Sequence, residues 1–397
     1  MIRFLPPFLA ALVLSACAAT NIRPMAGGIS PLRVEGKQLR DAKGRAVVLR
    51  GVNHHRFLDV PDGGWDAPGE VLYSGMGRWR PEVIRRTMEG FRAMGFNVVR
   101  FHTVVDWWKS DPRTYKDPYR DVTYPLSYRD MMEETIRMAG EAGMYVILDL
   151  YAMKNVQGVQ SGQESIPWGT WNRHPDVVPD RAEFIAVWAS IAGRLGRYPN
   201  VLFELYNEPN GDEKARQEWF RFVREVLPVL RKHTANPVIV QWDFMAWVNL
   251  DYPPPAHGAS TLSWIAEHSL GDPQVVYGTH LYRNSGGGGG GSVHRGVNPP
   301  MNCGARDDLA LGLRLMGFDS LEKPLIVTEI GAYLKNGGED REREVRWLKE
   351  MLSLLNERGI GYVGWGWASE DQIHHGMLKD GKPNEAGEVL IKAISAK

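Results

Sequence analysis

The sequence predicts an α/β fold, a single (β/α)8 TIM barrel preceded by an N-terminal β-hairpin. The chain has 397 residues, of which 43% are hydrophobic, enough for one large core. Short apolar runs alternate with amphipathic stretches along most of the chain, which is typical of repeated strand–helix units and a parallel sheet. Eight such runs are present, the number that closes a barrel.

Residues 32–40 and 46–53 flank a turn at 41–44, and this hairpin is expected to close the floor of the barrel. Helical periodicity follows most strands; in 81–95, for example, Pro81 suits the first turn and Gly95 the end. The predicted strands are 47–53, 97–101, 145–150, 201–206, 238–242, 275–280, 324–329 and 362–367. The predicted helices are 81–95, 127–142, 180–197, 212–233, 306–316, 340–358 and 384–395, with a less defined one within 256–268.

The first residues, MIRFLPPFLAALVLSAC, predict an export signal, because one early cation precedes an apolar run too short to span a bilayer. The run ends in LSAC, which resembles the lipobox of bacterial lipoproteins, in which Cys17 becomes the lipidated first residue. The alternative is an ordinary signal peptide cleaved one or two residues later. The lipobox predicts a signal over 1–17, a flexible tether over 18–30 and the barrel domain over 31–397, anchored at a bacterial outer membrane or cell surface.

Charge and cysteine content restrict the partners. Lys+Arg and Asp+Glu both number 47, so the chain lacks the basic footprint that nucleic acid requires. The 14 tryptophans suit flat, uncharged ligands such as sugar rings, although core packing accounts for many of them. With Cys17 lipidated, only Cys303 remains and no intramolecular disulfide can form. We expect a monomer without a cofactor.

Two carboxylates stand at the ends of the fourth and seventh predicted strands, where a parallel barrel carries its active site. They are Glu208, in VLFELYNEPN, and Glu329, in PLIVTE. Hydrolysis of a glycosidic bond needs such a pair, one acid to protonate the leaving oxygen and one group to attack. Glu204 is excluded as the partner of Glu208, because four residues of strand span roughly 13 Å. Pro209 is expected to hold Glu208 in an extended backbone.

The chain resembles glycoside hydrolase family 5, the cellulase family, over the whole barrel, and Asn207-Glu208-Pro209 is the most specific motif. The resemblance implies that Glu208 is the acid/base and Glu329 the nucleophile of a retaining enzyme. It also implies that Asn207 binds the sugar 2-hydroxyl and that Arg100 orients the nucleophile. The remaining substrate-binding residues that it implies are His280, Tyr282 and the platform Trp367, with Trp365 as a close rival.

One position departs from the family pattern. The third strand usually ends with a His two residues after an Asp, whereas here Asp149 is followed at that spacing by Tyr151. A phenol donates a hydrogen bond but carries no positive charge, so the surroundings of the acid/base are in question. His102 could occupy part of that space. Asn53, at the end of the first strand, is a further candidate for substrate binding.

Two other classes of function remain at this stage. A metal hydrolase would need clustered ligands, but the adjacent pairs His54-His55 and His374-His375 would point to opposite faces of a strand, so no metal site is expected. A glycan-binding lipoprotein without catalysis is kept because of Tyr151. Our prediction is a retaining endo-β-1,4-glucanase that acts on a polysaccharide or oligosaccharide by double displacement. β-Mannanase, xyloglucanase and β-glucosidase activities of the same family are the alternatives.

Overall fold

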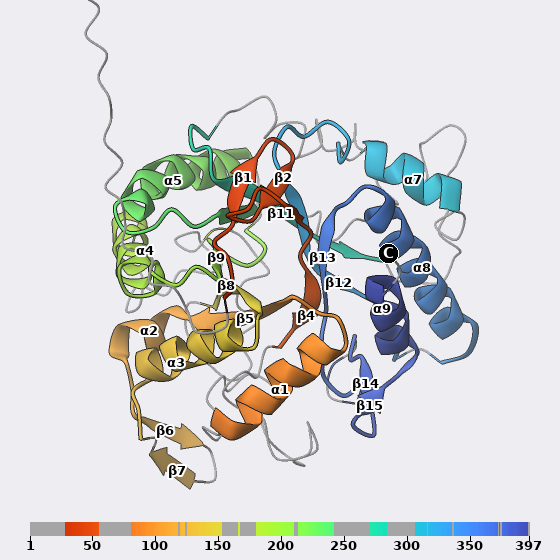
Figure 1. The fold of residues 1–397 in the computed structure, drawn as a ribbon, viewed down its shortest axis with the longest axis horizontal. Helices are drawn as coiled ribbons and strands as arrows, with labels where there is room; N and C mark the ends of the chain where they lie inside the picture. Colours follow the sequence, from red (N-terminus) through yellow and green to blue (C-terminus); the bar gives the residue numbers. More distant parts are fainter. Residues whose placement is uncertain are drawn as a thin grey trace, which may run out of the picture.

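In the computed structural model of the chain, eight parallel strands close into a barrel (Figure 1). The residues that the structure describes are 28–54, 81–117, 120–123, 125–152, 166, 180–209, 213–241, 270–283, 306–315, 317–335, 337–371, 373 and 375–395. The predicted leader, Cys17, Cys303 and the expected helix within 256–268 lie outside them, as do His55, His374 and the side chain of Tyr151.

The barrel strands follow one another in sequence order, and all eight predicted strands are confirmed. β4 pairs with β5 and β13, and the circle closes through β8, β9, β10, β11 and β12. Every barrel pair is parallel. The strands are β4 (Arg50–Asn53), β5 (Val98–Val104), β8 (Tyr145–Ala152), β9 (Val201–Glu204), β10 (Val238–Gln241), β11 (Val275–Tyr282), β12 (Leu325–Gly331) and β13 (Gly361–Gly364).

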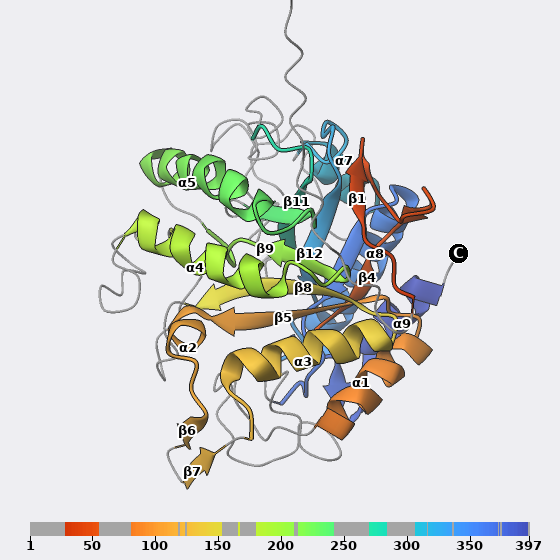
Figure 2. The same ribbon diagram turned by 60° about the vertical axis from the view of Figure 1, so that its left-hand side comes forward.

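Helices cover the outside of the barrel and pack apolar faces against it. Figure 2 shows α4 and α5 side by side, with β8 and β5 in view between α4 and α3. Local signals start two of these helices: the Ser127 and Asp180 side chains accept hydrogen bonds from the backbone N–H of Asp130 and Glu183. The helices are α1 (Pro81–Ala93), α2 (Val105–Ser110), α3 (Tyr128–Glu141), α4 (Arg181–Leu195), α5 (Glu213–Arg231), α7 (Arg306–Leu315), α8 (Gly338–Glu357) and α9 (Glu385–Ser395).

The amino-terminal segment closes the floor of the barrel, but with one more strand than predicted. It forms a three-stranded antiparallel sheet of β1 (Arg33–Glu35), β2 (Gln38–Arg40) and β3 (Ala46–Val47). The predicted single strand 32–40 turns at Gly36, where φ is +56°, a conformation that glycine adopts without strain. Val34 and Leu39 of this sheet join apolar side chains of the barrel strands in one cluster.

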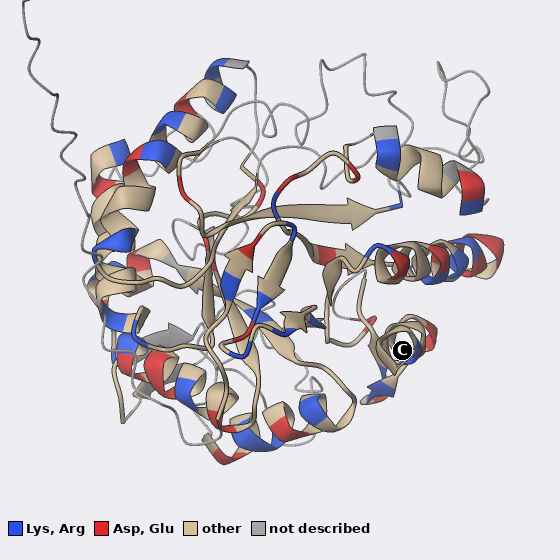
Figure 3. Cartoon of the chain, turned by 45° about the horizontal axis from the view of Figure 1, so that its top comes forward, with Lys and Arg blue, Asp and Glu red and all other residues tan. Residues whose placement is uncertain are grey.

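Two small hairpins lie outside the barrel: β6 (Thr114–Asp117) with β7 (Arg120–Thr123), and β14 (Leu378–Lys379) with β15 (Lys382–Pro383). Figure 3 shows that basic and acidic residues alternate over the outer helices, as the zero net charge leads one to expect. Among the residues that the structure describes, no helix is both long enough and apolar enough to cross a bilayer.

Candidate active site

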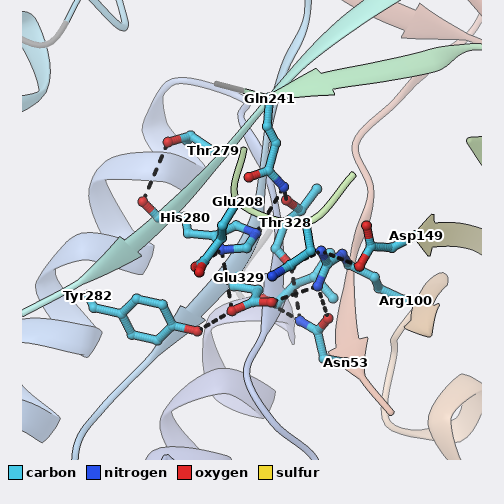
Figure 4. A network of polar contacts seen from close by, with 12 residues as sticks. Asn53, Arg100, Asp149, Glu208, Gln241, Thr279, His280, Tyr282, Thr328 and Glu329 are labelled. Atoms are coloured by element: carbon cyan, nitrogen blue, oxygen red, sulfur yellow. Dashed lines mark hydrogen bonds and ion pairs between the residues drawn. The ribbon is translucent and has the colours of Figure 1, made fainter. Parts of the chain in front are cut away.

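Polar side chains at the carboxyl ends of the barrel strands converge on one guanidinium, that of Arg100 from β5 (Figure 4). Its Nε donates to Glu204 Oε2 at 2.5 Å, and its Nη1 donates to Glu329 Oε1 at 2.7 Å. Its Nη2 lies 3.0 Å from Asp149 Oδ2. Arg100 therefore joins β5 to β8, β9 and β12 through three carboxylates.

These four groups are almost completely removed from water, which sets their charges. Burial opposes the charge of Arg100, but Asp149, Glu204 and Glu329 outweigh it and raise the pKa of the guanidinium, so it stays cationic. Burial raises the pKa of Asp149 to about 7, against the attraction of Arg100 and with help from the charge of Glu208. One buried cation thus faces more acidic groups than it neutralises.

Glu204, which sequence spacing excluded from catalysis, is buried inside the barrel and fully engaged. Its Oε1 accepts hydrogen bonds from Gln241 Nε2 at 2.5 Å and from Thr328 Oγ1 at 2.7 Å, and its Oε2 accepts from Arg100. A Cβ at the neighbouring Gly278 would collide with Ile239 Cγ2 at 2.7 Å but would only touch Glu204 Oε1, at 3.4 Å. Glu204 anchors Arg100 from below.

Two asparagines complete the shell of Arg100, and they differ in what they offer a ligand. Asn53 accepts from Arg100 at 2.9 Å, donates to the backbone oxygen of Thr328 at 3.0 Å and has no exposed surface. This placement supports Arg100 and speaks against the predicted contact of Asn53 with substrate. Asn207 Oδ1 accepts from Arg100 at 2.8 Å, which leaves its amide hydrogens to face another partner.

The two predicted catalytic carboxylates meet at His280. Its Nδ1 lies 2.6 Å from Glu208 Oε1 and 3.4 Å from Glu329 Oε2. One oxygen of each carboxylate and a ring nitrogen of His280 all lie within 4.8 Å of one another. Carboxyl groups about 5 to 5.5 Å apart are typical of retaining glycosidases, whereas inverting enzymes need about 6.5 to 9.5 Å.

The proton of His280 is directed by Gln241, a residue that the sequence analysis did not single out. Gln241 Nε2 is oriented by Glu204 and lies 3.1 Å from His280 Nε2. Because an amide N–H can only donate, His280 Nε2 accepts and Nδ1 carries the hydrogen that points to Glu208. Burial lowers the pKa of His280 to about 4, so the ring is neutral. A polar residue ending the apolar run VIVQ was the available signal for Gln241.

Glu208 has the properties of a proton donor. It is 7% exposed, and burial raises its pKa to about 7, opposed by Arg100 and assisted by Glu204. The predicted extended backbone is wrong, since its φ is +49°, in the left-handed region. Such a conformation costs on the order of 1 to 3 kcal/mol in a residue other than glycine. In this backbone conformation the Glu208 carboxyl lies 2.6 Å from His280 Nδ1.

Glu329 is surrounded by donors that favour its ionised form. Tyr282 donates its hydroxyl to Glu329 Oε2 at 2.6 Å, while Arg100 binds the other oxygen. Burial still raises the pKa of Glu329 above its ordinary value, against His280 and Arg100. Because Arg100 and Tyr282 both hydrogen-bond to Glu329, its ionised form is stabilised directly. The pKa of Tyr282 lies well above its ordinary value, through burial and the charge of Glu329, so the phenol keeps its proton.

The two rival tryptophans after β13 lie in different surroundings. Trp367 is 8% exposed and packs edge-on against Phe91 and Phe96, with ring centroids 5.8 and 5.6 Å away. This core position speaks against Trp367 as the sugar platform. Trp365 is partly exposed and lies beside His102, with ring centroids 5.6 Å apart. Gly331 makes room for it, since a Cβ there would stand 2.4 Å from the Trp365 carbonyl oxygen.

Among the described residues, one group of side chains has the spacing that a metal site would need. Within that part of the chain, Glu208, His280 and Glu329 are the group whose ligand atoms lie close enough to hold a metal ion. His280 Nδ1 already points its hydrogen at the Glu208 carboxyl, which is the arrangement of an acid/base pair. His54 is buried and contacts Phe91 edge-on, on the side of the core.

A barrel that carries a buried carboxyl pair at the ends of its fourth and seventh strands defines the class of barrel glycoside hydrolases. Residues 40–371 match the family described as Cellulase (glycosyl hydrolase family 5). The chain therefore belongs to glycosyl hydrolase family 5.

Individual relatives are distant. The chain is 25% identical to "Endoglucanase E-5" of Thermobifida fusca and 24% identical to "Endoglucanase A" of Butyrivibrio fibrisolvens, over 85% and 86% of its own length. It spans only 56% and 61% of the length of those two proteins. A β-glucanase of Saccharophagus degradans, solved with cellotetraose, has the same fold with a TM-score of 0.63 and 18% identity, covering 98% of this chain and 97% of that one. An endocellulase of Pyrococcus horikoshii gives a TM-score of 0.65 at 18% identity, covering 94% and 99% of the two chains.

The raised pKa of Glu208 predicts how stability depends on pH. A carboxyl whose pKa rises from 4.5 to about 7 on folding stabilises the protein below its unfolded pKa, and that stabilisation is lost as the pH rises through 7. Glu208→Gln cannot ionise, so relative to the wild type it should gain on the order of 3 kcal/mol between pH 5 and pH 8. Urea unfolding at the two pH values measures this. The control is Glu342→Gln, an exposed site on α8. Equal pH dependence in both variants would contradict the assignment.

Proposed function

We propose that this protein is a retaining β-glycosidase that cleaves β-1,4-linked glucan within the chain. The observation that carries this proposal is the approach of ligand atoms of Glu208, His280 and Glu329 to within 4.8 Å, with Arg100 and Tyr282 hydrogen-bonded to Glu329. The pair is too close to hold a water molecule between it and the sugar in the way that an inverting enzyme requires. A direct attack by one carboxylate is the chemistry that fits.

In the first step Glu329 attacks the anomeric carbon and the bond to the leaving oxygen breaks. Glu208 gives its proton to that oxygen, and its raised pKa keeps the proton available near neutral pH. Arg100 and Tyr282 each bind one oxygen of Glu329, which fixes the attacking carboxylate. Asn207, whose oxygen is held by Arg100, directs its amide hydrogens to the 2-hydroxyl of the sugar.

In the second step water replaces Glu329 at the anomeric carbon. When Glu329 becomes an ester, a negative charge within 4.8 Å of Glu208 disappears, which favours the ionised form of Glu208. Glu208, already a carboxylate after giving its proton to the leaving oxygen, takes a proton from the attacking water. His280 donates to Glu208 through Nδ1 and stabilises the carboxylate in this second role. Trp365 is the side chain that we assign as the platform for the sugar ring.

The substrate class rests on relatives. The Thermobifida fusca and Butyrivibrio fibrisolvens proteins are named endoglucanases, and the structures from Saccharophagus degradans and Thermobifida fusca were solved with cellotetraose. A β-1,4-glucan or cello-oligosaccharide is therefore the substrate that we propose, with mannan, xyloglucan and short β-glucosides as alternatives. A panel of these polysaccharides, with product lengths measured, separates the alternatives.

Removal of the acid should separate substrates by their leaving groups. Glu208→Ala should lose roughly 10²- to 10⁴-fold in kcat/KM on soluble β-glucan, because the leaving oxygen must be protonated. A dinitrophenyl cellobioside needs no acid, so its glycosylation step should be nearly unchanged. Glu329→Ala is the control and should lose activity on both substrates. Equal losses on both substrates in Glu208→Ala would remove the acid from this residue.

We further propose that the chain is exported and anchored to a membrane through a lipid on Cys17. The support is the sequence LSAC after a short apolar run. Cys17→Ser should move the protein from the membrane fraction to the soluble fraction and abolish labelling by a radioactive fatty acid. Ala18→Ser is a matched control. A Cys17→Ser protein that stays in the membrane fraction would leave the lipid anchor without support.

A further inference from the structure

Glu344, on the outer helix α8, is a buried acid that the proposed mechanism does not use. The other buried residues of α8 are apolar, among them Trp347, Leu348 and Met351. The side chain of Glu344 is 1% exposed. A carboxylate in such a place costs free energy unless it is paired and hydrogen-bonded, so its partners show what it holds in place.

Both oxygens of Glu344 bind chain segments that leave the barrel beside the active site. Oε1 accepts a hydrogen bond from Arg283 Nη1 at 2.8 Å, and Oε2 accepts one from the backbone N–H of Tyr333 at 3.1 Å. Burial raises the pKa of Glu344, and these two donors oppose the rise. Arg283 directly follows β11, and Tyr333 lies two residues beyond β12. One carboxyl group therefore joins the ends of two neighbouring barrel strands.

Those two strands carry the phenol and the carboxylate that meet in the active site. Tyr282, the residue before Arg283, donates its hydroxyl to Glu329 Oε2 at 2.6 Å (Figure 4). In the strand register Tyr282 lies opposite Gly331, and a Cβ at Gly331 would stand 3.4 Å from the Tyr282 ring. The phenol therefore passes over Gly331 to reach Glu329, and its reach depends on how the ends of β11 and β12 are held.

A second line of contacts joins Tyr333 to the same phenol. The ring of Tyr333 packs edge-on against His375, with centroids 5.4 Å apart, and His375 packs against Tyr282, with centroids 4.8 Å apart. Glu344 is therefore connected to Tyr282 in two ways. One runs along the backbone from Arg283, and the other runs through the rings of Tyr333 and His375.

We propose that Glu344 is a positioning residue for the nucleophile, which keeps the Tyr282 hydroxyl on Glu329 by holding Arg283 and the Tyr333 backbone. The proposal rests on the glycosidase function proposed above, in which Glu329 attacks the sugar. A displacement of about 1 Å at a reacting group can cost on the order of 10²-fold in rate, so the loss of this support is measurable in the kinetics.

A double-mutant cycle separates this role from a general contribution to folding. Glu344→Gln removes the charge that binds Arg283, and Tyr282→Phe removes the hydroxyl that binds Glu329. The two single variants and the double variant are compared with the wild type on a dinitrophenyl cellobioside. With this substrate kcat/KM reports the attack by Glu329. Thermal unfolding confirms that each variant is folded.

In the wild-type background, Glu344→Gln should lose about 10-fold in kcat/KM. In the Tyr282→Phe background it should lose less than about twofold, because the hydroxyl that it positions is already absent. Glu344→Asp keeps the charge on a shorter side chain and provides a second cycle with the same expected pattern. If Glu344→Gln does not fold, the cycle with Glu344→Asp decides by the same criterion.

The matched control is Glu350→Gln, the same substitution on the same helix. Glu350 binds Arg306 Nη1 of α7 at 3.1 Å, in a partly exposed contact between two outer helices. Its loss should leave kcat/KM at the wild-type value in both backgrounds.

The proposal is overturned if Glu344→Gln causes the same loss in both backgrounds, as a general loss of stability would. It is also overturned if Glu344→Gln keeps the wild-type kcat/KM, or if Tyr282→Phe has no effect. These results leave the glycosidase function standing, because the wild type still hydrolyses the substrate. A wild-type protein that hydrolyses neither the dinitrophenyl cellobioside nor any polysaccharide of the panel overturns the proposed function and this inference together.

Discussion

The contact between the Arg100 guanidinium and three buried carboxylates is the interaction on which the rest of the site depends. It joins strands that are distant in sequence, and each partner contributes to a different task. Glu204 anchors the cation from inside the barrel, Glu329 receives from it a fixed orientation, and Asp149 also contacts His102. Loss of the cation would leave buried negative charges without compensation. Such a loss typically costs about 3 to 5 kcal/mol, which is a large part of the free energy of unfolding of a domain.

Arg100 is one cation among several buried acidic groups, and it does not contact them equally. This inequality explains why the surroundings of Glu208 and Glu329 differ. Arg100 and Tyr282 bind Glu329, whereas Glu208 meets a neutral imidazole whose proton is directed by Gln241. Burial raises the pKa of both groups and Arg100 opposes it at both, but Arg100 and Tyr282 hydrogen-bond directly to Glu329. In the proposed mechanism, a nucleophile and an acid therefore arise from two identical side chains through the difference in their partners.

Much of the fold, and the meeting of Glu208 and Glu329, could be predicted, because both follow from periodic signals. Apolar runs marked all eight strands, and the ends of two of them marked Glu208 and Glu329. The rise per residue along a strand excluded Glu204 as the partner of Glu208, and in the structure Glu204 binds Arg100 instead. Two details could not be predicted from the sequence. The turn at Gly36 depends on a single residue inside an apolar pattern, and the choice between Trp365 and Trp367 depends on the path of the chain after β13, which periodicity does not encode.

The account makes Glu329 the residue that bonds covalently to the sugar, and one measurement tests this directly. A 2-fluoro-cellobioside with a dinitrophenyl leaving group should react with the protein and accumulate as an ester, because the fluorine slows both steps while the good leaving group speeds only the first. Peptide mass spectrometry of the inactivated protein should then find one added cellobiosyl group on Glu329. A label on Glu208 or Glu204, or turnover without any label and with an inverted product anomer, would contradict the account.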